Sequence, residues 1–459
     1  MGSMADDAAL LERCFDDLLL ESDAEDLYEP EEEEGLVAAV VRDLEDFDTH
    51  DTDEGDSDSD TEDNIWTDDA CCNDRWVFNE PTGAHQDVEY CETPLDFYEL
   101  FFSEELPQMV ATQTNIYGHQ KSRSWKETDI EELKRFFGLC LQMSRCPLDN
   151  QRNYWSPKPR NLARNGHSMA GDIMVRDRFE QLQRNLYFAD NSKADRSNKL
   201  YKIQPILDYL NAKFQRMYKP EKELCIDESM VPFRGRASFW QYSGAKRHRF
   251  GIKLFKLCSR AGYTLKVKVY AGKDPKRTRT VAESVVMELM DGFLKQGRCL
   301  CTDNWYTSSP LAHRLLKRRT DLVGTLGRNR KGLPTALKDK KLKRGEIFYQ
   351  QNQRGVLILK WRDRRIIHML PTKHDARCQP DGKPAVVADY NMMKGFVNLS
   401  DQMAAYTPYL RKTSKWYIRL FYHLITQTAL VNAWFHYCEK VKKNQDQLLQ
   451  GINCRCSHL

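Results

Sequence analysis

The sequence predicts an α/β protein built on a mixed sheet of the ribonuclease-H type, and three observations support this expectation. Asp227 follows the apolar run 224–226, and Asp303 follows the apolar run 299–301, so each reads as the end of a buried strand. Residues 250–270 contain two consecutive predicted strands that suit antiparallel pairing. Predicted helices and strands alternate after them. The 459 residues are enough for two or three domains.

The helical signals come first along the chain, from about residue 91. The segment Thr128-Asp129-Ile130-Glu131 resembles a capping box and precedes apolar residues at helical spacing. Pro205 is expected to open a second helix with one apolar side. A long helix is expected at about 413–443. These apolar stripes are interpreted as core.

The strand signals begin at about residue 223. Residues 250–257 form one strand signal, and residues 265–270 alternate apolar with basic side chains, which is typical of a half-buried antiparallel strand. A helix over roughly 280–295, the Asp303 strand, a helix over 310–319 and a strand over 322–326 complete the predicted order. Residues 327–387 are basic and partly strand-like, and they interrupt that order as an insertion.

Charge is distributed very unevenly along the chain. The net charge is +2, but residues 1–80 carry about 30 acidic and 3 basic side chains, so the remainder carries about +29. A basic body of this kind favours binding to a polyanion such as nucleic acid. The acidic arm is expected to be largely disordered. It is either an autoinhibitor that mimics DNA or a solubilising tail.

Cysteine usage and hydropathy indicate the cellular compartment in which the protein is expected. The 14 cysteines are scattered, and several lie inside apolar runs, which indicates a reducing compartment rather than a disulfide scaffold. No apolar run is long enough to span a bilayer, and no signal-peptide pattern occurs. The cytosol or the nucleus is therefore expected.

The two aspartates at the strand ends carry the chemical prediction. Carboxylates on neighbouring strands provide the oxygen ligands that Mg²⁺ prefers, and a metal pair held in this way can drive in-line phosphoryl transfer. An aspartate that ends a strand can also be an ordinary turn residue.

Ordered motifs along most of the chain resemble the piggyBac-type transposases and their domesticated derivatives. The resemblance covers about residues 95–440. The motifs that carry it are Trp155-Ser156, Arg178-Phe179, Leu186-Tyr187-Phe188-Ala189-Asp190-Asn191, Ile226-Asp227-Glu228-Ser229-Met230, Phe233-Arg234-Gly235-Arg236, Arg249-Phe250-Gly251-Ile252-Lys253, Asp303-Asn304-Trp305-Tyr306-Thr307-Ser308, Gly327-Arg328-Asn329-Arg330-Lys331-Gly332, Asp401-Gln402-Met403 and Arg411-Lys412-Thr413-Ser414-Lys415-Trp416.

The resemblance implies a domain organisation. It places a ribonuclease-H-like core at 223–326 and 388–405 and an insertion domain at 327–387, and these follow the acidic disordered arm at 1–90 that the composition predicts. A helical dimerisation and DNA-binding region would be built from 91–222 and 406–445. Residues 446–459 would be a tail without the complete zinc domain of many relatives, because Cys454, Cys456 and His458 are too few for a closed site. No zinc is therefore expected.

The resemblance also implies an activity, which is cut-and-paste DNA transposition at TTAA sites in the nucleus. It implies two Mg²⁺ or Mn²⁺ ions, double-stranded DNA as the partner, a homodimer and no membrane association. Asp227 and Asp303 match the first two catalytic aspartates and would be metal ligands.

The third catalytic position departs from the family pattern. The family has Gly-Gly-Val-Asp-x-x-Asp, but this chain has Phe396 at the second glycine and Asn398 at the third catalytic aspartate, and only Asp401 is kept. An asparagine brings no negative charge to offset a metal pair. The catalytic expectation therefore covers Asp227, Asp303, Asn398 and Asp401, with Asp401 as a candidate third ligand.

Three explanations for the departure stay open. A domesticated copy could have lost cleavage while keeping DNA binding, an engineered substitution could trap a DNA complex, or Asp401 could complete the site. Three functions are considered separately: an active transposase, a catalytically inactive chromatin or DNA-binding factor, and an interaction protein that acts through its acidic arm.

Basic side chains around the aspartates are the expected contacts to DNA phosphates, and Trp305 is expected either to stack on a base or to belong to the core. The predicted DNA-binding residues are Lys246, Arg247, Arg249, Lys253, Lys276, Arg277, Trp305, Arg328, Arg330, Lys331, Arg411, Lys412 and Lys415.

Overall fold

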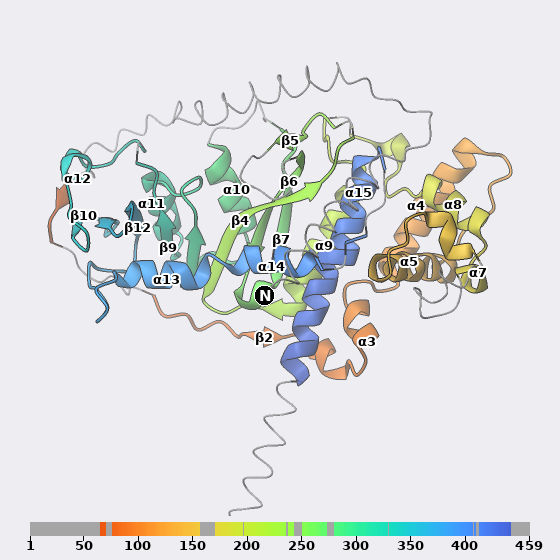
Figure 1. Ribbon diagram of the computed structural model, residues 1–459, viewed down its shortest axis with the longest axis horizontal. Coiled ribbons are helices and arrows are strands. Elements are labelled where there is room, and N and C mark those ends of the chain that lie inside the picture. The colour runs from red at the N-terminus through yellow and green to blue at the C-terminus, as the bar shows by residue number, and fades with distance from the viewer. Residues whose placement is uncertain are drawn as a thin grey trace, which may run out of the picture.

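Helices and strands form a mixed α/β arrangement (Figure 1). The structure is a computed structural model, which describes residues 65–69, 76–156, 170–195, 197–235, 237–242, 250–272, 280–328, 330–406, 408–409 and 413–441. In Figure 1 the strands occupy the centre and one side of the molecule, and the helices α4, α5, α7 and α8 lie at the opposite side.

One sheet organises the described residues. Its strand order is β1-β10-β11-β12-β9-β8-β4-β6-β5, and β7 also pairs with β6. The strands are β1 (Trp66–Thr67), β4 (Glu223–Pro232), β5 (Gln241–Tyr242), β6 (Phe250–Cys258), β7 (Thr264–Val269), β8 (Cys299–Thr302), β9 (Asp321–Thr325), β10 (Ile347–Asn352), β11 (Leu357–Arg362) and β12 (Ile366–Pro371).

The centre of the sheet confirms the predicted mixed pairing. β4 runs antiparallel to β6 and parallel to β8, and β8 runs parallel to β9. The short apolar runs form β4 and β8 because both faces of these strands are covered, which parallel pairing requires. The expected alternation at 265–270 is also present, since Leu265, Val267 and Val269 are buried while Lys266 and Lys268 are partly exposed.

Helices cover both faces of this central sheet. Leu224 and Ile226 of β4 belong to the main core, which they share with α9 (Gln204–Met217), α10 (Val281–Leu289) and α11 (Ser309–Lys317). Cys225, which points to the other face, belongs to a second core with α13 (Ala385–Met393) and α14 (Phe396–Ala404). The second core is the one that brings α14 beside β4.

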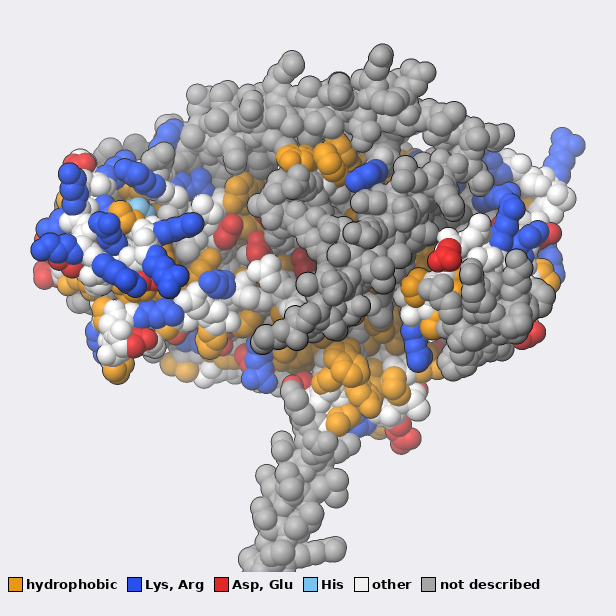
Figure 2. All heavy atoms as spheres, in the orientation of Figure 1, with side chains coloured by type: hydrophobic (Ala, Val, Ile, Leu, Met, Phe, Trp, Pro, Cys, Tyr) orange, Lys and Arg blue, Asp and Glu red, His pale blue; other side chains and the backbone are white. Residues whose placement is uncertain are grey.

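The predicted insertion, residues 327–387, continues the same sheet. β10, β11 and β12 form an antiparallel meander, and β12 pairs with β9 through Met369 opposite Thr325. The short helix α12 (Thr335–Asp339) precedes the meander. Figure 2 shows lysine and arginine side chains gathered over this part of the molecule.

The described residues of the predicted acidic arm are ordered. β1 pairs with the edge strand β10, with Trp66 opposite Asn352 and Thr67 opposite Gln351. β2 (Gly83–Ala84) pairs with β3 (Tyr218–Lys219) at the end of α9. β1 thus extends the edge of the large sheet, whereas β2 and β3 form a separate two-stranded sheet.

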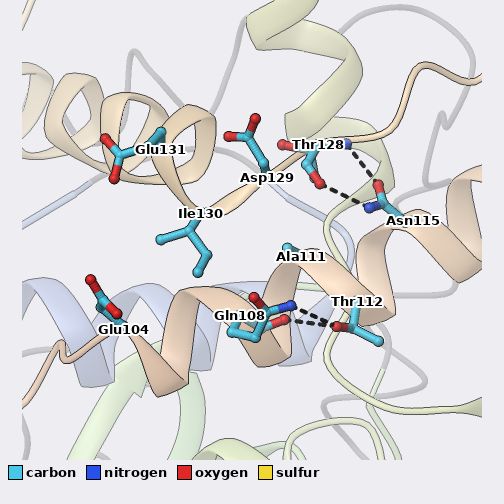
Figure 3. Close-up of a pocket in the computed structure, with 9 residues that line it drawn as sticks. All are labelled: Glu104, Gln108, Ala111, Thr112, Asn115, Thr128, Asp129, Ile130 and Glu131. Carbon is cyan, nitrogen blue, oxygen red and sulfur yellow. Dashed lines mark hydrogen bonds between the residues drawn. The ribbon is translucent and has the colours of Figure 1, made fainter.

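The helical region contains α3 (Pro94–Glu99), α4 (Glu105–Lys121), α5 (Ile130–Arg145), α7 (Ala170–Ile173) and α8 (Arg176–Asn185). The predicted capping box at 128–131 was wrong in detail, because Asp129 is the N-cap of α5 and accepts a hydrogen bond from the Glu132 amide. Thr128 is diverted by Asn115, whose side chain bonds both the amide and the carbonyl of Thr128 (Figure 3).

The predicted helix at 413–443 begins at α15 (Trp416–His423). It continues through a π-helical turn, Leu424–Thr428, and remains helical from 429 to 441. Among the residues that the structure describes, no helix has the length and apolar character needed to cross a membrane.

His436, on this last helix, predicts an acid-sensitive fold. Its ring is 1% exposed and stacks near Phe101, and burial lowers the pKa of His436 to about 4. Because this pKa lies below the unfolded value of about 6.5, stability is complete above pH 6.5 and is lost as the pH falls toward 4. Between pH 7 and pH 5 the group accounts for a loss of about 2 kcal/mol. His436→Phe is expected to remove this part of the pH dependence in denaturant unfolding.

The matched control is His119→Phe, because His119 lies on the exposed side of α4. This change is expected to leave the pH dependence unchanged. An unaltered pH dependence in His436→Phe would contradict the assignment.

Candidate metal and phosphoryl-transfer centre

Asp227 and Asp303 lie at equivalent positions on neighbouring parallel strands. The last paired residues of β4 and β8 are Cys225 and Cys301, and each aspartate lies two residues further along the chain. Neighbouring strands are about 4.8 Å apart. The register therefore brings the two carboxylates together, as the sequence predicted, at the point where β8 ends and β4 continues.

The loop that carries Asp303 is fixed by hydrogen bonds. The Trp305 amide donates to Asp303 Oδ1 at 2.9 Å, and the Thr307 hydroxyl donates to the Asp303 carbonyl at 2.6 Å. Arg330 donates from its guanidinium to the carbonyls of Asn304, Trp305 and Thr307. The aspartate is thus presented by a turn that has little freedom to move.

Negative charge is concentrated around Asp303. Burial, together with the negative charges of Glu228 and Asp227, raises the pKa of Asp303 to about 6. Carboxylates that are held together against their mutual repulsion are suited to a divalent cation, which offsets the repulsion.

Asp401 faces the sheet from α14, whereas Asn398 is exposed. Asp401 Oδ1 accepts hydrogen bonds from Ser229 Oγ and from Lys256 Nζ, both at 2.8 Å. Phe396, the other departure from the family pattern, is buried in the core between the sheet and helices α13 and α14. The phenyl ring therefore acts in packing α14.

The donor set fits a hard divalent ion in part. Asp227 and Asp303 supply two carboxylates, which are ligands that Mg²⁺ and Mn²⁺ accept. Within the described residues, however, no group of three or more histidine, cysteine or acidic side chains is arranged to hold a metal ion. One ion between Asp227 and Asp303 is compatible with the geometry. The expected second ion would need ligands beyond this pair.

Lys253 and Trp305 lie together beside the carboxylates. Lys253 Nζ is 2.8 Å from Glu228 Oε1 and 4.7 Å from the centre of the Trp305 ring, and Trp305 stacks on Phe255 at 5.7 Å. Trp305 is therefore partly packed against the core while one part remains exposed. Lys253 balances the charge of Glu228.

The other predicted DNA contacts have different surroundings. Arg330 is engaged by the Asp303 loop, and Lys415 Nζ donates to the Arg184 carbonyl. Arg328 and Lys331 are exposed close to the Asp303 loop in sequence. Seven predicted contacts lie outside the described residues: Lys246, Arg247, Arg249, Lys276, Arg277, Arg411 and Lys412.

Sequence reasoning missed three residues at this centre, Glu228, Ser229 and Lys256. Lys256 left a signal, because it interrupts the apolar run Leu254-Phe255-Lys256-Leu257 at a position that proves to be fully buried. A lysine in such a run indicates a buried partner.

A pocket of about 490 Å³ lies elsewhere, in the helical region between α4 and the start of α5 (Figure 3). None of the predicted site residues lines it. The carboxylate centre, and not this pocket, carries the chemistry that the fold suggests.

Comparison with known proteins identifies the class of this fold. The structure resembles a piggyBac transposase solved as a synaptic complex with hairpin DNA, with a TM-score of 0.71, 26% sequence identity, and coverage of 80% of this chain and 79% of that chain. This likeness confirms the predicted ribonuclease-H-like α/β class. The sequence model of a family described as transposase IS4 matches residues 93–434.

Two human proteins are similar over most of the chain. PiggyBac transposable element-derived protein 2 is 26% identical over 385 residues, which cover 78% of this chain and 64% of the relative. PiggyBac transposable element-derived protein 3 is 25% identical over 370 residues, which cover 74% of this chain and 60% of the relative. The chain therefore belongs to the piggyBac-type transposase family, and the matched region spans somewhat under two thirds of these relatives. Transposases of this kind generally use divalent metal ions.

The repulsion around Asp303 predicts a stabilising substitution in the metal-free protein. Asp303→Asn removes one buried charge, so at pH 7 in a chelator the melting temperature should rise by a few degrees, on the order of 2–4 °C. Added Mg²⁺ should raise the melting temperature of the original chain and leave that of Asp303→Asn unchanged. Differential scanning calorimetry measures both shifts.

Asp172→Asn, at an exposed position of α7, is the control and should keep the original response to Mg²⁺. A full Mg²⁺ response in Asp303→Asn would show that this carboxylate does not bind the ion.

Proposed function

We propose that this protein binds double-stranded DNA and acts on it as a transposase of the piggyBac type. The observation that carries the proposal is the equivalent placement of Asp227 and Asp303 on the parallel strands β4 and β8. A divalent ion bound there would activate the attacking oxygen and stabilise the leaving oxygen at a phosphodiester. TTAA-flanked transposon ends are the proposed substrates, and Mg²⁺ or Mn²⁺ is the proposed ion.

The residues of the chain itself have definable parts in this proposal. Asp227 and Asp303 hold the ion, and Arg330 fixes the turn that presents Asp303. Trp305 is partly exposed beside the carboxylates, which suits stacking against an unpaired base. Arg328 is exposed at the carboxyl end of β9, on the side of the sheet from which Asp303 emerges, and suits a phosphate contact.

A second candidate function is DNA binding without strand cleavage. It is favoured by the exposed carboxamide of Asn398 and by the engagement of Asp401 with Lys256 and Ser229. Both leave the centre with fewer free carboxylates than two ions require. A nuclear location and a homodimer are part of either candidate and stay predictions.

Nicking of a TTAA-flanked end separates the two candidates. With Mg²⁺ or Mn²⁺, Asp227→Ala should abolish any nicking by the chain, since it removes an ion ligand. Asn398→Asp should raise the nicking rate by at least about tenfold, because a third carboxylate improves ion binding at the centre. Single-turnover assays on end-labelled duplexes measure the rates.

Asn391→Asp, at an exposed position of α13, is the matched control for Asn398→Asp and should not change the rate. Nicking that survives Asp227→Ala would contradict the proposed centre. If the original chain does not nick DNA and Asn398→Asp does, the result would support the second candidate function, DNA binding without cleavage.

Binding to duplex DNA should depend steeply on salt in either case. The logarithm of the affinity should fall linearly with the logarithm of the salt concentration, and Arg328→Gln should reduce the slope by about 0.9. Fluorescence anisotropy with a labelled duplex measures the slope. Lys317→Gln, at the exposed end of α11 away from the carboxylates, should leave the slope unchanged. A salt-independent affinity would contradict phosphate binding by this basic body.

A further inference from the structure

A fully buried lysine lies beside the carboxylate centre. Lys256 on β6 is directly opposite Asp227 on β4, and its side chain is 0% exposed. Directly opposed residues of an antiparallel pair project to the same face of a sheet, and so do residues two apart on one strand. Asp227, Ser229 and Lys256 therefore share the face that α14 covers.

The ammonium group of Lys256 is bound to Asp401. Lys256 Nζ and Ser229 Oγ each lie 2.8 Å from the same oxygen, Asp401 Oδ1. The ion pair thus connects β6, β4 and α14 at a single atom. Burial and the charge of Lys256 lower the pKa of His423 of α15 to about 3, and the charge of Asp401 acts in the opposite direction, so His423 lies within electrostatic reach of the pair.

Breaking the ion pair between Lys256 and Asp401 would cost free energy. An ammonium group buried without a counter-ion costs several kcal/mol, so a variant or a metal ion that draws Asp401 away leaves that cost behind. Asp401 Oδ1 can serve as a metal ligand only if Lys256 and Ser229 find other partners. The fixed positive charge of Lys256 also disfavours a second dication on this face.

We propose that Lys256 is a positioning residue that commits Asp401 to a structural ion pair and thereby limits the Asp227–Asp303 centre to one divalent ion. This inference rests on the proposed function for the identity of the centre. It assigns Asp401 to holding α14 against the sheet, which differs from the sequence prediction that Asp401 is the third metal ligand. Lys256 is then a second residue, besides Asn398, that disfavours the binding of two ions.

The test is to count bound Mn²⁺ on the full chain without DNA, by electron paramagnetic resonance of free Mn²⁺. The original chain is expected to bind one Mn²⁺, and Asp227→Asn is expected to lose it. Lys256→Met removes the positive charge and keeps a similar side-chain length, so Asp401 is released from the ion pair. This variant is expected to bind a second Mn²⁺, or to bind the first at least tenfold more tightly. Lys266→Met, on the partly exposed face of β7, is the control and should behave like the original chain.

Asp401→Asn provides the independent readout. It should retain the single Mn²⁺ and lower the melting temperature, because Lys256 loses its counter-ion. The double variant Lys256→Met/Asp401→Asn should recover most of that loss and should not gain the second ion. A merely structural role for Lys256 would give the stability pattern without any change in Mn²⁺ binding.

Either of two results would overturn the proposal. One is Mn²⁺ binding in Lys256→Met that equals that of the original chain in number and affinity. The other is loss of the first Mn²⁺ in a folded Asp401→Asn variant. Failure of the proposed function is a separate result, namely the expected Mn²⁺ counts with no action on DNA.

Discussion

The parallel pairing of β4 with β8 is the constraint on which the rest of the centre depends. It ends at Cys225 and Cys301, so that two aspartates emerge side by side where one strand stops and the other continues. The buried thiols and leucines before them secure this register, because a shift by one residue would exchange the faces of the whole strand. α14, the Asp303 loop and the buried lysine are all positioned relative to this point.

The charges around the centre are balanced unequally. Lys253 offsets Glu228, and Lys256 offsets Asp401, while the charge of Asp227 raises the pKa of Asp303. The mutual repulsion of Asp227 and Asp303 is the physical reason to expect a cation there. The balance of charges also explains why Asn398 and Lys256 both disfavour a second metal ion. Each lowers the negative charge that a second dication would need.

Much of the fold could be predicted from the sequence because its signals are local. Apolar runs, alternation at 265–270 and Pro205 fixed the strands and helices, and the two aspartates were predicted from the runs that precede them. The N-cap of α5 could not be predicted, since Thr128 is drawn away by Asn115 from the preceding helix. Lys256 could be recognised as unusual but not assigned a partner, because Asp401 lies 145 residues further along the chain. The addition of β1 to β10 likewise depends on an edge that only the folded sheet presents.

The most direct test is anomalous scattering from crystals of the full chain grown or soaked with Mn²⁺. The account predicts a single manganese peak between Asp227 and Asp303, with carboxylate oxygen ligands and with Asp401 still bound to Lys256. A peak ligated by Asp401, or crystals in which Asp227 and Asp303 bind no manganese at saturating concentration, would contradict it.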